Sequence, residues 1–241
     1  MLFRSAWNLK RGTGSVRLFE SGNVYALAGA KTEERRTLCL GATGNAGPAS
    51  LHEAPRPYGF FDLKGDVEAL LESFADSGLH YEENASEAYH PGRSARAVLE
   101  GATVARFGQI HPEIAAARKL RQDVFVAEVH LDRLYRQALR EPRYQAIPRF
   151  PAVERDFSFF FDEATRFEQI RGAIAALGLK ELTSARPAEI FRGGSVPAGQ
   201  YSMLLRATFQ SGERTLRDDE VAAWSARIVQ ALEGLGGKLR A

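Results

Sequence analysis

Val153-Glu-Arg-Asp-Phe-Ser-Phe-Phe-Phe161 is the stretch that decides the fold of the second half of the chain. Its aromatic and β-favouring residues predict a strand, and alternate residues of a strand lie on opposite faces. The face that we expect to be core holds the set Arg155, Phe157, Phe159 and Phe161. The opposite face holds Asp156, Ser158 and Phe160.

The segments that follow this strand predict a complete domain. After it we expect, in chain order, a helix over Phe167–Leu177, strands over Ala188–Phe191 and Gln200–Phe209, a helix over Asp218–Leu232, and a short strand over Lys238–Arg240. The order βαββαβ in about 95 residues is that of the split-βαβ, ferredoxin-like plan. In this plan both helices cover one face of a four-stranded antiparallel sheet, so the other face is open to a partner.

The open face carries groups that suit RNA. In the third strand, alternation assigns Tyr201, Met203, Leu205, Ala207 and Phe209 to the core, and it leaves Ser202, Leu204, Arg206 and Thr208 on the open side. An aromatic ring at Phe160, a guanidinium at Arg206 and neighbouring hydroxyls match the stacking and edge contacts that unpaired RNA bases make. The alternative to an RNA-binding surface is that this face of the sheet is simply exposed to solvent and binds nothing.

Three prolines between Glu141 and Pro151 predict a linker, and therefore two domains over residues 1–146 and 147–241. The first part is predicted to be an α+β domain whose strands follow one another with few crossover helices, which favours an antiparallel sheet. The expected strands cover Val16–Glu20, Arg36–Leu40, Thr103–Ile110 and Val124–Val129, and the expected helices cover Asp62–Ala75 and Glu113–Leu120.

Composition narrows the class of protein. The 241 residues contain 44% hydrophobic and 26% charged side chains, which excludes a disordered or fibrous chain. A net charge of +2 excludes sequence-blind capture of nucleic acid by the whole molecule, so any RNA contact must be local. The single cysteine, Cys39, is expected in the core and fits a reducing compartment. We find no membrane span and no signal peptide, and we expect a cytoplasmic protein without a membrane partner.

No motif predicts catalysis or a metal. The five histidines show no HExxH spacing, the sequence has no GxSxG, and the glycine-rich segment Gly41–Gly47 has neither GxGxxG nor P-loop spacing. His90 and His111 each precede a proline, so both are predicted in loops, in turns stabilised by side-chain hydrogen bonds. A less favoured hypothesis is an enzyme that assembles a histidine and carboxylate site around His90 or His111.

Seven segments, in this order and spacing, resemble the C-terminal part of bacterial phenylalanine–tRNA ligase beta subunits. They are Asn8-Leu-Lys-Arg-Gly12, Val16-Arg-Leu-Phe-Glu-Ser-Gly22, Phe60-Phe-Asp-Leu-Lys-Gly-Asp-Val-Glu68, His90-Pro-Gly-Arg-Ser-Ala95, Phe107-Gly-Gln-Ile-His-Pro112, Arg149-Phe-Pro-Ala-Val-Glu-Arg-Asp-Phe-Ser158 and Arg214-Thr-Leu-Arg-Asp-Asp-Glu-Val221. One departure is Glu189-Ile190-Phe191, where the family often has Phe-Asp-Val-Tyr.

The resemblance implies a partial class II synthetase-like domain without catalysis over residues 1–146 and a ferredoxin-fold anticodon-binding domain over residues 147–241. It also implies an alpha-subunit partner in a heterotetramer that holds tRNA(Phe), with ATP and magnesium used by the complete synthetase and none expected on this chain. Phe19-Glu20 stands where an active domain would carry an ATP-holding Arg-x-Glu pattern, and no GxGxGxxR segment is present. The amino-terminal modules are missing, so editing and DNA binding are not expected.

We therefore predict a non-catalytic, tRNA(Phe)-binding portion of a phenylalanine–tRNA ligase. The predicted RNA contacts are Arg155, Ser158, Phe160, Arg206 and Arg214. The alternative is a stand-alone interaction or regulatory protein that uses the open ferredoxin-like sheet for another partner.

Overall fold

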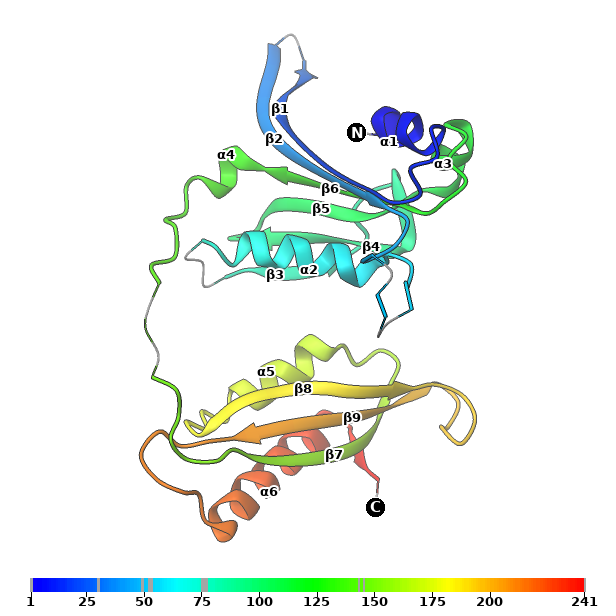
Figure 1. Cartoon of the computed structure of the whole chain (residues 1–241). Coiled ribbons are helices and arrows are strands. Elements are labelled where there is room, and N and C mark those ends of the chain that lie inside the picture. Colours follow the sequence, from blue (N-terminus) through cyan, green and yellow to red (C-terminus); the bar gives the residue numbers. More distant parts are fainter. Residues whose placement is uncertain are drawn as a thin grey trace. The chain divides into compact units, whose positions relative to one another are not determined.

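Two antiparallel sheets organise the chain, one in each of two units, residues 1–143 and 144–241 (Figure 1). They are seen in a computed structural model. The structure describes residues 2–29, 31–48, 50–51, 54–74, 78–142, 144 and 146–240. None of the described helices is both long and apolar enough to cross a membrane.

The first unit is a six-stranded sheet in the order β1-β2-β6-β5-β4-β3. Its strands are β1 (Val16–Ala28), β2 (Lys31–Thr43), β3 (His80–Glu83), β4 (Tyr89–Leu99), β5 (Ala102–Ile110) and β6 (Val124–His130). Its helices are α1 (Leu2–Leu9), α2 (Phe60–Leu71), α3 (Pro112–Ala117) and α4 (Leu131–Leu134).

Both faces of this sheet are covered near its centre, which explains why four successive residues of β6, from 124 to 127, are all buried. On one face α2 buries Leu63, Val67 and Leu71 against Phe107 and its neighbours. On the other face, α1 and α3 pack on a smaller cluster that includes Val124.

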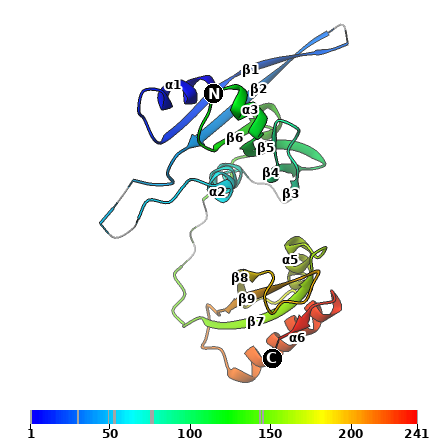
Figure 2. The same ribbon diagram turned by 90° about the vertical axis from the view of Figure 1, so that its right-hand side faces the viewer.

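The β1–β2 hairpin is longer than the sequence predicted. We expected two short strands joined by a connection, but the pairing runs without interruption from Val16 opposite Thr43 to Ala28 opposite Lys31. Gly29 has a φ of +65°, a left-handed conformation that glycine adopts readily at a tight hairpin turn. The sequence did not predict the outer half of β2 because residues 31–36 are mostly charged. These residues are exposed on both faces of the strand, so no alternation of buried and exposed side chains marks them. Figures 1 and 2 show the hairpin extending beyond the rest of its sheet.

The second unit confirms the predicted βαββαβ order. It contains β7 (Val153–Asp162), α5 (Phe167–Ala175), β8 (Leu182–Phe191), β9 (Gln200–Phe209), α6 (Asp218–Gly234) and β10 (Lys238–Leu239). The sheet order is β10-β7-β9-β8, and every adjacent pair is antiparallel. Figure 2 shows α5 and α6 on the same side of the sheet.

The core of this unit depends on β7. Phe157, Phe159 and Phe161 are buried, and they pack with Ile170 of α5 and Ile228 of α6, as alternation predicted. Between α6 and β10 the chain passes so close to this core that a Cβ on Gly237 would lie 2.6 Å from the Phe161 ring. The face of β7 opposite to this core is covered by neither α5 nor α6.

Cys39 gives a test of the first unit. The side chain is half-buried on β2 and packs against the cluster under α1 and α3, where burial and the facing Glu128 raise the thiol pKa to about 11. The thiolate is the reactive form, so at pH 8 we expect labelling by a disulfide reagent about two orders of magnitude slower in the native chain than in urea. Equal rates at pH 8 would contradict this packing.

Candidate nucleic-acid interface

The open face of the second unit is built from rows of side chains that the strand register places opposite one another. Residues directly opposite in an antiparallel pair share a face, so each row can be followed across the sheet. The first row, from β10 to β8, is Lys238, Phe160, Ser202 and Phe191. The next rows are Ser158, Leu204 and Glu189, then Asp156, Arg206 and Arg186, then Glu154, Thr208 and Ser184.

Two phenylalanines make this face aromatic. Phe160 of β7 is half-buried and Phe191 of β8 is 58% exposed, and they flank Ser202, which is buried to 3% exposure. The Arg240 guanidinium lies 5.7 Å from the centre of the Phe160 ring, and the Arg240 backbone N–H donates to the Ser158 carbonyl at 2.7 Å. Flat rings and a guanidinium plane are the surfaces on which unpaired bases stack.

Arg206 is held in place by carboxylates. Its Nε and Nη2 donate to the two oxygens of Asp156 at 2.8 and 2.7 Å, and Nη1 lies 3.7 Å from Glu154. The hydrogen bond from Arg206 lowers the pKa of Asp156, and the same bond raises the pKa of Arg206. Arg206 therefore presents a fixed guanidinium plane whose charge is largely compensated.

The other cations of this face are less constrained. Within the described residues, Arg186, Lys238 and Arg240 form no ion pair. All three are exposed, and they lie on the two edge strands and just after β10. A phosphate group could reach any of them without displacing a carboxylate.

Arg155 and Arg214 lie elsewhere. Arg155 follows the alternation onto the helical side of the sheet, where its Nη2 is 3.8 Å from Asp218 of α6. Arg214 donates from Nη1 and Nη2 to the two oxygens of Glu220, both at 2.7 Å. This hydrogen bond, supported by the Arg217 backbone N–H, lowers the pKa of Glu220 to about 2. The predicted contacts thus fall into two groups: Ser158, Phe160 and Arg206 on the open face, and Arg155 and Arg214 beside the start of α6.

Sequence reasoning missed four residues of the open face: Arg186, Phe191, Lys238 and Arg240. The second strand was predicted to begin at Ala188. In the structure this strand, β8, begins at Leu182 and therefore includes Arg186. Pro187 lies within β8, where a proline is tolerated because β8 is an edge strand and its register shifts after this residue. Continuing the alternation from Phe160 to the facing strands would have found the others.

His90 and His111 each accept a hydrogen bond from a backbone N–H two residues further along the chain. His90 was predicted in a loop, which is wrong, because it lies in β4; its Nδ1 accepts a hydrogen bond from the Gly92 N–H at 3.1 Å. His111 precedes α3 and accepts from the Glu113 N–H at 3.3 Å. Among the described residues, no group of three or more histidine, cysteine, aspartate or glutamate side chains could hold a metal ion.

The position expected for ATP in an active synthetase domain does not fit a nucleotide phosphate. Phe19 is exposed there, beside a cavity of about 240 Å³ lined mainly by apolar groups and by Asp66. The one arginine of the cavity, Arg17, lies over the Tyr58 ring and donates to the Ala46 carbonyl at 2.5 Å. We therefore derive no ATP chemistry from these residues.

Two family models match the chain, one over each of its two parts. The family model described as "Phenylalanyl tRNA synthetase beta chain CLM domain" matches residues 1–131, and "Ferredoxin-fold anticodon binding domain" matches residues 148–240. The solved structure of a pyrrolysyl-tRNA synthetase from Desulfitobacterium hafniense has a TM-score of 0.40 and 17% identity, over 56% of this chain and 48% of that chain.

Curated relatives named "Phenylalanine--tRNA ligase beta subunit" match almost the whole chain. The relative from Symbiobacterium thermophilum is 32% identical over 97% of this chain and 26% of its own length. The relative from Listeria monocytogenes serovar 1/2a is 34% identical over 96% of this chain and 29% of its own length. The chain thus spans less than a third of the length of these relatives. With residues 1–131 of 241 matched by its family model, the chain belongs to the phenylalanyl-tRNA synthetase beta-chain CLM domain family.

Proposed function

We propose that the second unit binds the anticodon arm of tRNA(Phe) on its open sheet face, and that the chain supports aminoacylation carried out by an alpha subunit. One observation carries the proposal: residues 148–240 match an anticodon-binding domain, and the face left uncovered by its helices holds two aromatic rings among arginines. This combination suits RNA, because stacking retains unpaired bases and cations hold the backbone.

Each group on this face has a separate part in the proposal. Phe160, covered on one side by Arg240, and Phe191 provide stacking planes. Arg206, fixed by Asp156, is suited to a directed contact with a base edge. The unpaired cations at the two edges of the sheet would position phosphates. Arg155 and Arg214 remain predicted contacts. From their place beside α6 they would contact the sugar–phosphate backbone of the RNA.

The proposal extends to the complete synthetase. There the alpha subunit would bind ATP and magnesium and carry out catalysis, within a cytoplasmic heterotetramer that includes this chain. The observation that favours an alpha-subunit contact is the β1–β2 hairpin, on which Phe19, Tyr25 and Leu27 are 78%, 66% and 82% exposed. These alternate residues share one face of the hairpin, and an exposed apolar patch of this kind marks an interaction site.

The variant Phe160→Ala tests the stacking plane. Loss of one stacked base costs about 1–3 kcal/mol, so we expect the Kd for tRNA(Phe) to rise about 5- to 150-fold, measured by fluorescence anisotropy. The control is Phe61→Ala, which removes an 81% exposed ring from α2 in the first unit and should leave the Kd unchanged. Equal affinities for the two variants, with unchanged circular dichroism, would remove Phe160 from the proposal.

The hairpin contact is tested by Leu27→Asp in the chain co-expressed with its alpha subunit. A carboxylate in the apolar patch should abolish co-purification, because burying an unpaired charge in an interface is costly. Val24→Asp is the matched control: Val24 is 50% exposed on the other face of the same strand, so its variant should still co-purify. Loss of the complex in the control alone would place the contact on the opposite face.

A further inference from the structure

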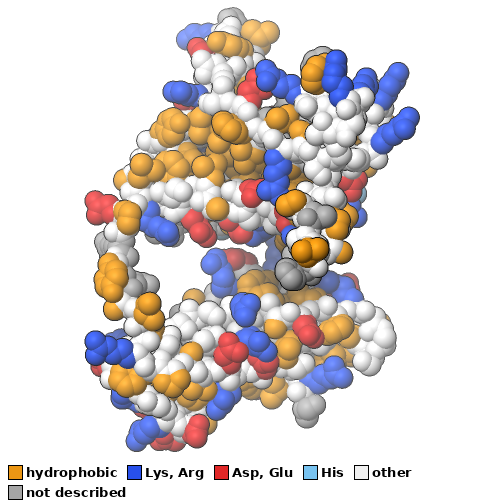
Figure 3. All heavy atoms as spheres, viewed as in Figure 1, with side chains coloured by type: hydrophobic (Ala, Val, Ile, Leu, Met, Phe, Trp, Pro, Cys, Tyr) orange, Lys and Arg blue, Asp and Glu red, His pale blue; other side chains and the backbone are white. Residues whose placement is uncertain are grey.

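A second basic surface lies on the first unit, around the segments that follow α1 and α3. Residues 1–15 and 114–122 each contain three lysines or arginines and no acidic residue, although the whole chain has a net charge of only +2. Figure 3 shows lysine and arginine side chains gathered over α1 and α3. We call the basic rim the set Lys10, Arg11, Arg118, Lys119 and Arg121, all of them exposed.

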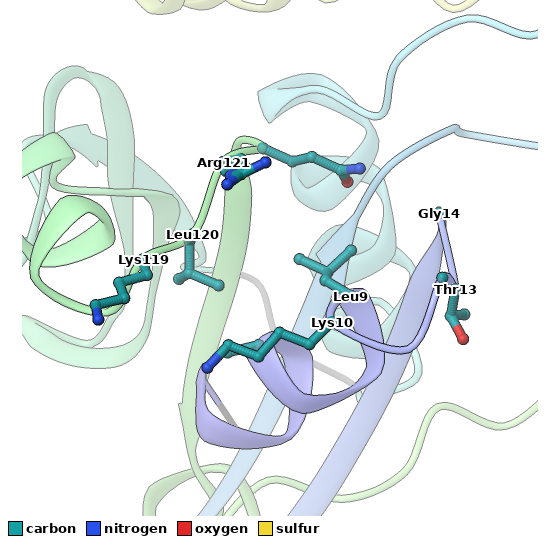
Figure 4. Close-up of a pocket in the computed structure, with 10 residues that line it drawn as sticks. Leu9, Lys10, Thr13, Gly14, Lys119, Leu120 and Arg121 are labelled. Atoms are coloured by element: carbon teal, nitrogen blue, oxygen red, sulfur yellow. The ribbon is translucent and has the colours of Figure 1, made fainter.

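The basic rim surrounds a cavity of about 530 Å³. Leu9 and Leu120 give it an apolar floor, while Lys10, Lys119 and Arg121 line its edge (Figure 4). Two left-handed residues shape the edge: Gly12 has a φ of +85° after α1, and Lys119 has a φ of +55° after α3. The cavity therefore has an apolar floor and cations along its edge, and it is large enough for one nucleotide unit.

The cations of the basic rim have no acidic partner in the part of the chain that the structure describes. Within the described residues, no ion pair joins any member of the basic rim to a carboxylate, whereas Arg96 of the same unit is paired with Glu82. The neighbouring Asp123 is engaged by Gln109, whose Nε2 donates to it at 2.9 Å, and by Arg93 at 3.8 Å. Clustered charges of one sign repel one another, so an anion would relieve the repulsion.

Cations often occur at the C-terminal end of a helix for reasons of helix stability alone, and this could explain the basic rim. Lysine and arginine near a helix C-terminus are favoured because that end carries about half a negative charge. However, α1 and α3 together supply about one negative charge by this effect, against five positive charges on the basic rim. The ends of the helices therefore explain the presence of one or two of these cations and leave a positive excess.

An aromatic group beside the basic rim indicates the kind of anion. The Arg11 guanidinium lies 3.4 Å above the centre of the Trp7 ring, and Trp7 is 47% exposed on α1. A stacked arginine and tryptophan next to unpaired cations offer both a plane for a base and charge for phosphates. A free inorganic anion would use the cations alone.

We propose that the basic rim and its cavity bind the sugar–phosphate backbone of RNA, at a site separate from the open face of the second unit. Binding here needs no particular base sequence, because phosphate contacts carry none. The first unit would then add affinity to whatever selectivity the second unit provides. This inference requires that the chain meet RNA, but it does not require that Phe160 or the open face read the anticodon.

The test is the salt dependence of RNA binding by the full chain carrying Lys10→Gln, Lys119→Gln and Arg121→Gln together. For single-stranded RNA the slope of log K against log salt changes by about 0.7 for each phosphate contact, so the slope should fall by about 2. The probes are tRNA(Phe) and a 15-nucleotide oligouridine, with ATP as a free-nucleotide probe. The matched control, Lys31→Gln with Arg136→Gln and Arg140→Gln, removes the same charge from exposed positions of the same unit.

The expected result is a shallower slope and weaker binding for both RNAs in the first triple variant, with little change in the control. Equal slopes in the two triple variants would overturn the proposal. Loss of ATP binding without any change in the RNA slope would also overturn it, by showing a site for free nucleotides. Failure of the anticodon proposal is distinguishable, because it would appear as an unchanged Kd in Phe160→Ala.

Discussion

The second unit depends on the alternation of side chains in β7. Phe157, Phe159 and Phe161 supply the core under α5 and α6, and burial of each ring contributes about 2–3 kcal/mol. The same constraint leaves Ser158 and Phe160 on the opposite face. A shift of one residue in register would exchange the two sets, so the core and the proposed RNA face are fixed by one property of the backbone.

The charges on the open face are arranged by the same register. Asp156 lies directly opposite Arg206, and two hydrogen bonds join the guanidinium to the carboxylate. Arg206 is compensated on the middle strands β7 and β9, whereas Arg186, Lys238 and Arg240, which form no ion pair within the described residues, lie on β8, on β10 and just after β10. A face built in this way has aromatic rings next to exposed cations, although the net charge of the whole chain is only +2.

Much of the second unit could be predicted from the sequence, because its strands alternate strictly and its core is aromatic. The position of Phe160 and Arg206 on one face was confirmed, whereas Arg186 was missed because the strand was predicted only from Ala188 onward. The first unit was harder: β3 and β4 were not predicted, and the charged outer half of the β1–β2 hairpin has no buried face to mark it. Local propensity cannot indicate strands that are specified by pairing across the sheet.

The account is tested most directly by the affinity of the chain for tRNA(Phe) and for a tRNA with a different anticodon, measured at two salt concentrations. Contacts with phosphates weaken as salt rises, whereas stacking and base-edge contacts depend much less on it. We predict a preference for tRNA(Phe) that persists at the higher salt concentration. Equal affinity for both tRNAs at both concentrations would contradict an anticodon-reading face on β7, β8 and β9.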